Sequence, residues 1–218
     1  RRKNRIEQLT TDNGTICTNE KEIGDMVTEF YGKLYRAENT VGMEEVLSHI
    51  PCKVDDAMNQ MLNSPYTSTE VKEALFYMFP TKAPGPDGFS AHFFQRHWDV
   101  CGTVVRTVVL RIINGTELVT SVNETILVLI PKVTNPTLLS QFRPISLCNV
   151  LYKIASKVVA NRLKQILPDI ISEEQSAFVP GRLITDNIIA AYECLHFMTR
   201  NKAKKHQSCA LKLDMMKA

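Results

Sequence analysis

The chain has 218 residues, of which 44% are hydrophobic and 22% are charged, and its formal net charge is only +3. This composition excludes a wholly disordered chain, and the length allows one domain or two small ones, each with a buried core. No apolar run comes near the ~20 residues that a membrane-spanning helix needs, so we expect no membrane partner.

Charge is divided unevenly along the chain. Residues 1–100 carry eleven Lys and Arg against fifteen Asp and Glu, whereas residues 101–218 carry fifteen against eight. A basic half suits a phosphate backbone as partner, although a solvated basic face is the commoner origin of such a surplus.

The six cysteines show no metal-binding or disulfide pattern. They include no Cys-x-x-Cys pair and no nearby His pair at zinc spacing. We therefore expect reduced thiols, no disulfide-linked partner and an intracellular location, nuclear or cytoplasmic. The start at Arg1-Arg2-Lys3 has neither an initiator Met nor the apolar segment of a signal peptide, so we also expect a cut N-terminus.

The first predicted elements are a hairpin and a helix. Residues 5–18 surround the turn sequence Asp12-Asn13-Gly14, which favours a tight hairpin. From Glu20 to Tyr35 the apolar residues recur at helical spacing, with Asn19 as the predicted N-cap. We interpret residues 1–66 as an N-terminal linker hairpin and helix.

Two helices and a stiff turn are predicted next. Thr67 and Glu70 have the spacing of a capping box and open a helix that should reach Phe79 before Pro80. A second helix is predicted from Ser90 to Asn114. Between them lies a turn in which two prolines fix φ and two glycines permit positive φ, and we assign it a structural role. It reads Pro84-Gly85-Pro86-Asp87-Gly88.

The second half begins with a strand at residues 124–132 and a helix at 149–167 that Pro168 should end. On that helix Ile154, Val158 and Ile166 should point inward, and the basic residues should point largely outward. Those basic residues are Lys153, Lys157, Arg162 and Lys164.

A last helix is predicted at residues 183–200, capped at Thr185 or Asp186. Residues 208–214 then alternate apolar and polar side chains, which predicts a strand that ends at Asp214. On residue types alone, Asp214 is a solvated aspartate at a strand end.

Three segments in this order and spacing change that interpretation. They read Lys82-Ala83-Pro84-Gly85-Pro86-Asp87-Gly88-Phe89, then Leu129-Ile130-Pro131-Lys132 followed by Phe142-Arg143-Pro144-Ile145-Ser146, then Ala177-Phe178-Val179-Pro180-Gly181-Arg182 followed by Thr185-Asp186-Asn187. Together they resemble the reverse transcriptases of LINE-type (non-LTR) retrotransposons, particularly plant elements. The resemblance implies an α/β (α+β) right-hand polymerase, with fingers and first palm strand over residues 67–218 and an end before the catalytic hairpin.

The resemblance assigns Asp214 as a catalytic residue and the first ligand of two Mg²⁺ ions, which stabilise the attacking and leaving oxygens of nucleotidyl transfer. The other two carboxylates of the family lie in a Tyr-Ala-Asp-Asp-like hairpin, and no such segment occurs in this sequence. We therefore expect the chain alone to extend no primer. Met216 also departs from the small Ser usual between the aspartate and Lys217-Ala218.

The resemblance further makes Lys132 and Arg143 the clamp on the triphosphate of a dNTP, for which lysine and arginine have suitable donors. On spacing alone, both could be exposed hairpin charges.

Gly181 and Arg182 belong, by the same resemblance, to a loop that contacts the RNA template and DNA primer. Taken alone, Val-Pro-Gly-Arg is simply a turn. Lys153 could border the template groove, with a solvated helix face as the alternative.

Two rival interpretations stay open. The chain could be a non-catalytic retroelement relic that binds nucleic acid weakly or does nothing. It could also derive from a group II intron maturase, although the stretches 83–89 and 143–164 fit the LINE type better.

Overall fold

The structure is a computed structural model that forms two compact units. One comprises residues 1–52 and 64–159, and the other comprises residues 53–63 and 160–218. The described residues are 6–11, 13–37, 42–116, 120, 122–200 and 209–211.

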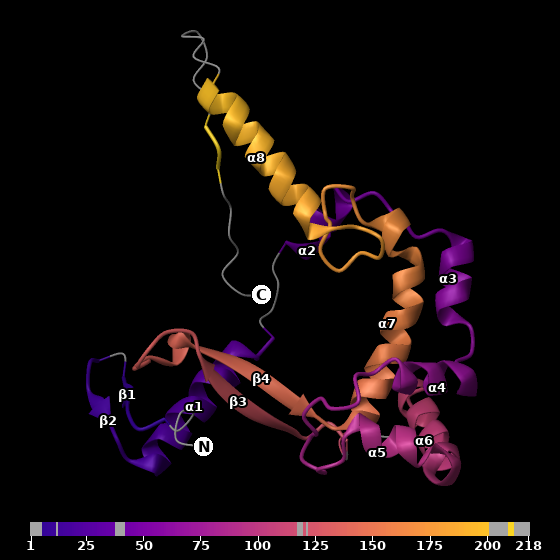
Figure 1. The fold of residues 1–218 in the computed structure, drawn as a ribbon, viewed down its shortest axis with the longest axis horizontal. Coiled ribbons are helices and arrows are strands. Elements are labelled where there is room, and N and C mark those ends of the chain that lie inside the picture. Colours follow the sequence, from indigo (N-terminus) through magenta and orange to yellow (C-terminus); the bar gives the residue numbers. More distant parts are fainter. Residues whose placement is uncertain are drawn as a thin grey trace. The chain divides into compact units, whose positions relative to one another are not determined.

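Within the described residues, the chain forms one small antiparallel sheet, then helices α1 to α6, then a second small antiparallel sheet and two further helices (Figure 1). The sheets pair β1 (Leu9–Thr10) with β2 (Ile16–Cys17), and β3 (Thr125–Pro131) with β4 (Phe142–Cys148). This mixture confirms the predicted α+β class. The helices are α1 (Glu20–Leu34), α2 (Met43–Ser48), α3 (Asp56–Asn63), α4 (Ser68–Phe76), α5 (Ala91–Arg96), α6 (Trp98–Ile113), α7 (Val150–Ile170) and α8 (Ile184–Arg200).

The N-terminal hairpin and its helix form as predicted. The Asn19 side chain caps α1 by accepting hydrogen bonds from the backbone N–H groups of Lys21 and Glu22. Leu9, on β1, is fully buried and begins a small core whose members come from β1, β2, α1 and the end of the β3–β4 hairpin. That core comprises Leu9, Cys17, Ile23, Leu139 and Phe142.

Helix α4 opens with the predicted capping box, in which the Thr67 side chain accepts from the Glu70 N–H and the Glu70 carboxylate accepts from the Thr67 N–H. The helix ends at Phe76, three residues earlier than the predicted Phe79. The reason is that the Gln95 side chain donates to the carbonyls of Leu75 and Met78, which supplies partners for the last turn.

The long helix predicted from Ser90 to Asn114 is in fact two helices. His97 has non-helical angles and both ends α5 and begins α6. The break lets Phe94 on α5 and Val109 on α6 enter the same core, and α4 contacts both helices. Packing against α4 therefore overrides the continuous helical pattern of the sequence.

The larger core joins these three helices to the first turns of α7. The side chains at its centre have no exposed surface. Because hydrophobic stabilisation scales with buried apolar area, this core contributes most of the hydrophobic stabilisation of the unit. These side chains are Val71, Ala74, Leu75, Val109 and Ile154. The inward positions predicted on α7 are confirmed, because Ile154, Val158 and Ile166 are all buried.

Helix α7 continues past Pro168 to Ile170, so the prediction that this proline ends the helix was wrong. A proline near the end of a helix forfeits few backbone bonds, and the Ile171 N–H still donates to the Leu167 carbonyl. The carbonyls of Pro168 and Ile171 instead accept from the guanidinium of Arg182.

The outward position predicted for Arg162 was also wrong. Its side chain is only 5% exposed, and its Nη1 donates to the Leu62 carbonyl at 3.1 Å. A buried guanidinium needs such partners, because desolvation without hydrogen bonds would be costly.

Helix α8 begins at Ile184, so Thr185 and Asp186 lie inside its first turn and are not its N-cap, contrary to prediction. None of its residues is buried. Of the strand predicted at 208–214, the structure describes only Cys209, Ala210 and Leu211, which are exposed and not in a strand, and Asp214 lies outside the described residues.

The turn at residues 84–88 packs closely against the junction of β4 and α7. A Cβ on Gly85 would lie 2.4 Å from the Asn149 Oδ1, 2.5 Å from the Asn149 N and 2.6 Å from the Cys148 carbonyl carbon. Only glycine fits at such distances. The Lys153 Nζ donates to the Ala83 carbonyl at 3.1 Å and reinforces the contact.

We predict that Gly85→Ala destabilises the fold by about 1–3 kcal/mol, because the new methyl group meets backbone that cannot move freely. Thermal unfolding monitored by circular dichroism measures the effect. The matched control is Gly32→Ala on α1, where a Cβ meets nothing within 4 Å. That control should stabilise the helix by about 0.5–1 kcal/mol. Equal stability of Gly85→Ala and wild type would contradict the close contact.

Candidate functional site

The register of the β3–β4 hairpin brings two predicted site residues to one face. Ile130 pairs with Arg143, and the Lys132 N–H donates to the Gln141 carbonyl at 2.8 Å. Because side chains alternate along a strand, Lys132 shares a face with Ile130 and therefore with Arg143. Such diagonal neighbours lie roughly 7–8 Å apart, which is close enough for both to contact one anionic group.

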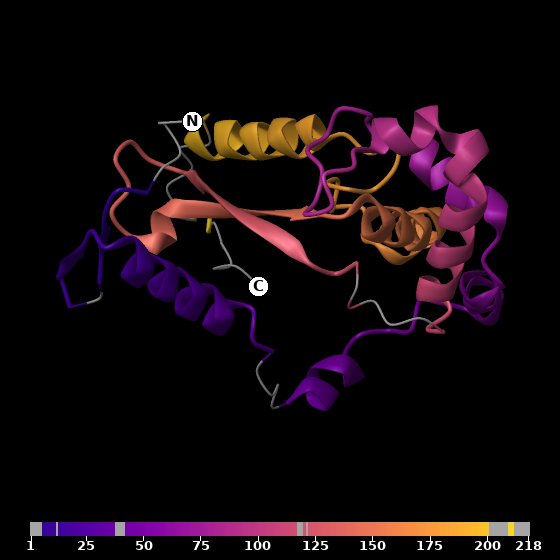
Figure 2. The same cartoon turned by 90° about the horizontal axis from the view of Figure 1, so that it is seen from below.

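The same face of the hairpin is apolar and open (Figure 2 shows the ribbon that the two strands form). Ile126, Ile130 and Ile145 lie on it and are 38–48% exposed. The opposite face carries Phe142, which is only 3% exposed in the small core. The hairpin thus has one face that carries the buried Phe142 and one face that ends in two exposed cations.

The two cations differ in their partners. The Lys132 Nζ donates to the Ser140 carbonyl at 2.7 Å, within the connection between the strands. Arg143 is exposed, and no hydrogen bond or ion pair of its side chain is seen among the described residues. Arg143 therefore has its guanidinium available for a ligand.

No acidic residue near these cations in the sequence neutralises their positive charge. The chain has no Asp or Glu between Glu124 and Asp169, and this stretch contains six Lys and Arg. Four of them belong to the unit that contains the hairpin, namely Lys132, Arg143, Lys153 and Lys157. Such a run attracts polyanions and does not repel them.

Arg182 occupies a different environment from the one its assignment suggested. Its Nη1 donates to the carbonyls of Ser172 and Gln175, and its Nη2 donates to those of Pro168 and Ile171. The guanidinium thus caps the end of α7 and closes the following loop. Gly181, beside it, has φ of +79° and open space around it, as a glycine in a turn requires.

Two further features of this loop concern its charge and its backbone. The pKa of Glu174 is lowered by hydrogen bonds from its own backbone N–H and from the Ser172 side chain, with smaller effects of Lys53 and Arg182. Phe178 has φ of +66° and is 95% exposed.

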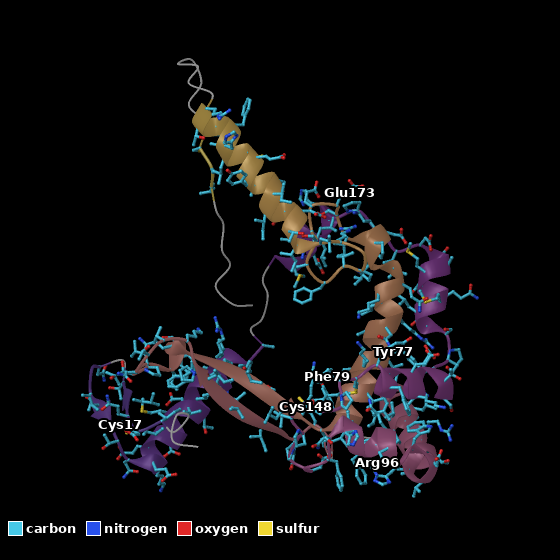
Figure 3. All side chains as sticks on the ribbon, viewed as in Figure 1. Cys17, Tyr77, Phe79, Arg96, Cys148 and Glu173 are labelled. Atoms are coloured by element: carbon cyan, nitrogen blue, oxygen red, sulfur yellow. The ribbon has the colours of Figure 1, made fainter. Side chains whose placement is uncertain are left out.

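Sequence reasoning missed Asn149, which is 7% exposed at the end of β4. Its Oδ1 accepts from the Asp87 N–H at 3.3 Å, and its Nδ2 donates to the Val122 carbonyl at 3.4 Å. A position directly before a helix was the available signal, because asparagine is a common N-cap. Figure 3 labels the adjacent Cys148.

The metal ligand assigned from the sequence cannot be placed. Asp214 lies outside the described residues, and within them no group of three His, Cys, Asp or Glu side chains could hold a metal ion. Across the same described residues, no helix is long and apolar enough to cross a membrane.

Comparisons with known proteins found a matching family and a similar transposon protein. Residues 130–218 match the family described as reverse transcriptase (RNA-dependent DNA polymerase). The chain is also 34% identical over 197 residues to a Xenopus laevis protein described as the transposon TX1 uncharacterized 149 kDa protein. That alignment covers 89% of this chain and 15% of the relative, so the chain spans a small part of the relative's length.

We predict that Arg182→Ala accelerates backbone amide exchange across residues 171–182 by about 5- to 150-fold, because losing the four carbonyl contacts should cost about 1–3 kcal/mol locally. Hydrogen exchange with mass spectrometry measures it. Arg182→Lys should recover little, since lysine lacks the planar fork. Arg200→Ala, an exposed position on α8, is the control. Unchanged exchange in Arg182→Ala would refute the capping role.

Proposed function

We propose that the chain belongs to the reverse transcriptases of non-LTR retrotransposons and supplies the fingers and first palm strand of an RNA-directed DNA polymerase. In this proposal residues 1–66 are a linker and residues 67–218 belong to the polymerase. The proposed substrates are dNTPs, an RNA template and a DNA primer. An intracellular location and a plant-type element remain predictions.

The observation that carries the proposal is the shared face of Lys132 and Arg143. A triphosphate offers several anionic oxygens, so two cations on strand positions roughly 7–8 Å apart can bind it together. Arg143 supplies a planar fork and Lys132 a mobile charge. The exposed isoleucines on the same face, Ile126, Ile130 and Ile145, give an apolar surface beside the charges.

Reverse transcriptases are nucleotidyl transferases that use a divalent metal. We propose Mg²⁺, with Asp214 among its ligands, because a carboxylate is the hard oxygen donor that Mg²⁺ prefers. When bound, the metal would stabilise negative charge on the reacting oxygens. Residues Lys132 and Arg143 would hold the triphosphate in position for that reaction.

Contacts with the template and primer are proposed for Gly181, Lys153 and the other lysines between Glu124 and Asp169, and not for the buried Arg162. The exposed backbone at Gly181 allows close approach to a phosphate. The guanidinium of Arg182 is engaged by carbonyls, so we propose that it acts on nucleic acid indirectly, by holding the Gly181 loop in shape.

A second candidate is a non-catalytic relic that retains weak nucleic-acid binding. The observation that favours it is Met216, which stands where a small residue is usual between Asp214 and Lys217. The two candidates differ in one measurement, because only an active polymerase that contains this chain incorporates dNTPs.

We predict that Arg143→Ala in the full-length polymerase raises the KM for dNTPs by about 10- to 100-fold, which is the loss expected for a charge-assisted contact. Steady-state primer extension measures it. Affinity for primer–template should stay within about twofold, because the clamp acts on the triphosphate. Arg96→Ala, an exposed arginine on α5, should leave both quantities unchanged. An equal loss of primer–template affinity would make Arg143 a general backbone contact.

We predict that residues 1–218 bind single-stranded RNA weakly, with an affinity that falls steeply as salt rises, because phosphate neutralisation releases counterions. Fluorescence anisotropy with labelled RNA and monodisperse protein measures this dependence. Replacing both Lys132 and Arg143 with Ala should make the plot of log K against log salt concentration less steep, by about 1.4 in slope, if both residues contact phosphates. Binding that is absent at low salt, or independent of salt, would remove this proposal.

A further inference from the structure

We propose that Asn149 is a positioning residue of the polymerase, which fixes the root of the β3–β4 hairpin on the helical core and so determines where Lys132 and Arg143 stand. We define the hairpin root as Gly85, Val122 and Asn149. The inference rests on the proposed function of the two cations.

The Asn149 side chain uses both ends of its amide to join separate segments. Its Oδ1 accepts from the Asp87 N–H in the 84–88 turn, and its Nδ2 donates to the Val122 carbonyl, three residues before β3. Asn149 itself follows the last residue of β4. One buried side chain therefore connects the entry to β3, the exit from β4 and a turn 62 residues away.

The main chain of Asn149 ties the same root to α7. Its carbonyl accepts from the Lys153 N–H at 3.1 Å, which is the first helical hydrogen bond. The Val150 and Ile154 side chains that follow are 2% and 0% exposed in the larger core. Movement of the root is thereby opposed by the packing of α7 against α4, α5 and α6.

The contact at Gly85 is a second, independent sign that this junction is fixed. The turn approaches so closely that no side chain fits between Gly85 and the Asn149 backbone. The Gly88 N–H donates to the Gly85 carbonyl at 3.1 Å, and the Phe89 N–H donates to the Asp87 carboxylate at 3.1 Å. The turn is thus internally bonded, so it can hold Asn149 rigidly.

The root matters for the cations because a two-stranded hairpin is marginally stable by itself. Arg143 stands six residues before Asn149, roughly 20 Å along the strand. Over that length a 10° tilt at the root displaces Arg143 by about 3.5 Å, and a misplacement of about 1 Å can cost a hundredfold in rate. The far end of the hairpin is held by Phe142 and Leu139, which pack in the small core with β1, β2 and α1.

Two substitutions separate the contacts of Asn149. Asn149→Asp keeps an acceptor for the Asp87 N–H and removes the donor to Val122, whereas Asn149→Ala removes both. In the full-length polymerase we expect Asn149→Asp to raise the KM for dNTPs by about three- to tenfold, as for one lost hydrogen bond, and Asn149→Ala to raise it further. Affinity for primer–template should be unchanged. Asn123→Ala, at a nearby exposed position, is the control.

The decisive measurement is a double-mutant cycle with Arg143→Ala. If Asn149 acts by positioning Arg143, the effect of Asn149→Asp on the KM should largely vanish when Arg143 is already absent. A purely structural asparagine would give the same fold-change in both backgrounds, and that result would overturn the proposal.

A readout without catalysis separates failure of this inference from failure of the proposed function. Fluorescent unnatural amino acids at positions 135 and 104, near the hairpin end and on α6, report the distance between them by energy transfer in residues 1–218. We expect a broader distance distribution in Asn149→Ala than in wild type and Asn123→Ala. An unchanged distribution would overturn the inference, even if the polymerase is active. A broadened distribution, together with a full-length protein that incorporates no dNTP, would support the positioning and refute only the proposed function.

Discussion

The contact between Gly85 and Asn149 is the constraint on which the larger unit depends. It brings together the turn after α4, both ends of the β3–β4 hairpin and the start of α7. Hydrophobic burial alone would hold α4, α5, α6 and α7 together, but burial has no direction and would leave the hairpin free to tilt. Hydrogen bonds at the buried junction supply the missing direction. Tilting the hairpin would break them and leave the Asn149 amide buried without partners, which would be costly.

The arginines show why a surplus of positive charge is an uncertain guide to binding. Arg182 and Arg162 both donate to backbone carbonyls, and Arg162 is almost fully buried. Their guanidinium groups stabilise the smaller unit by donating to carbonyls at the end of α7, in the loop that follows it and at Leu62. Arg143 has the same chemistry and lies exposed on a strand, so it is the arginine of the three best suited to a ligand. The fate of each guanidinium follows from its neighbours and not from residue type.

Local signals in the sequence predicted the elements that depend on neighbouring residues. The Asn19 cap, the capping box of Thr67 and Glu70 and the inward face of α7 each follow from residues within a few positions. The wrong predictions depend on distant partners: Arg162 meets Leu62, 100 residues away, and the break at His97 depends on packing against α4. Of the candidate site, the pair Lys132 and Arg143 was expected from the family resemblance, whereas Asn149 required the fold and Asp214 lies outside the described residues.

Register links the buried Phe142 to the exposed Arg143 on the hairpin, and so links stability to the proposed function. Phe142 and Arg143 are adjacent, which places one in the small core and the other on the open face. A slip of one residue would exchange them, bury a guanidinium without partners and expose a phenyl ring. Both costs oppose the slip. The small core therefore specifies which face of the hairpin carries the cations, and the hairpin root specifies the direction in which that face points. These two constraints act at opposite ends of the same strands.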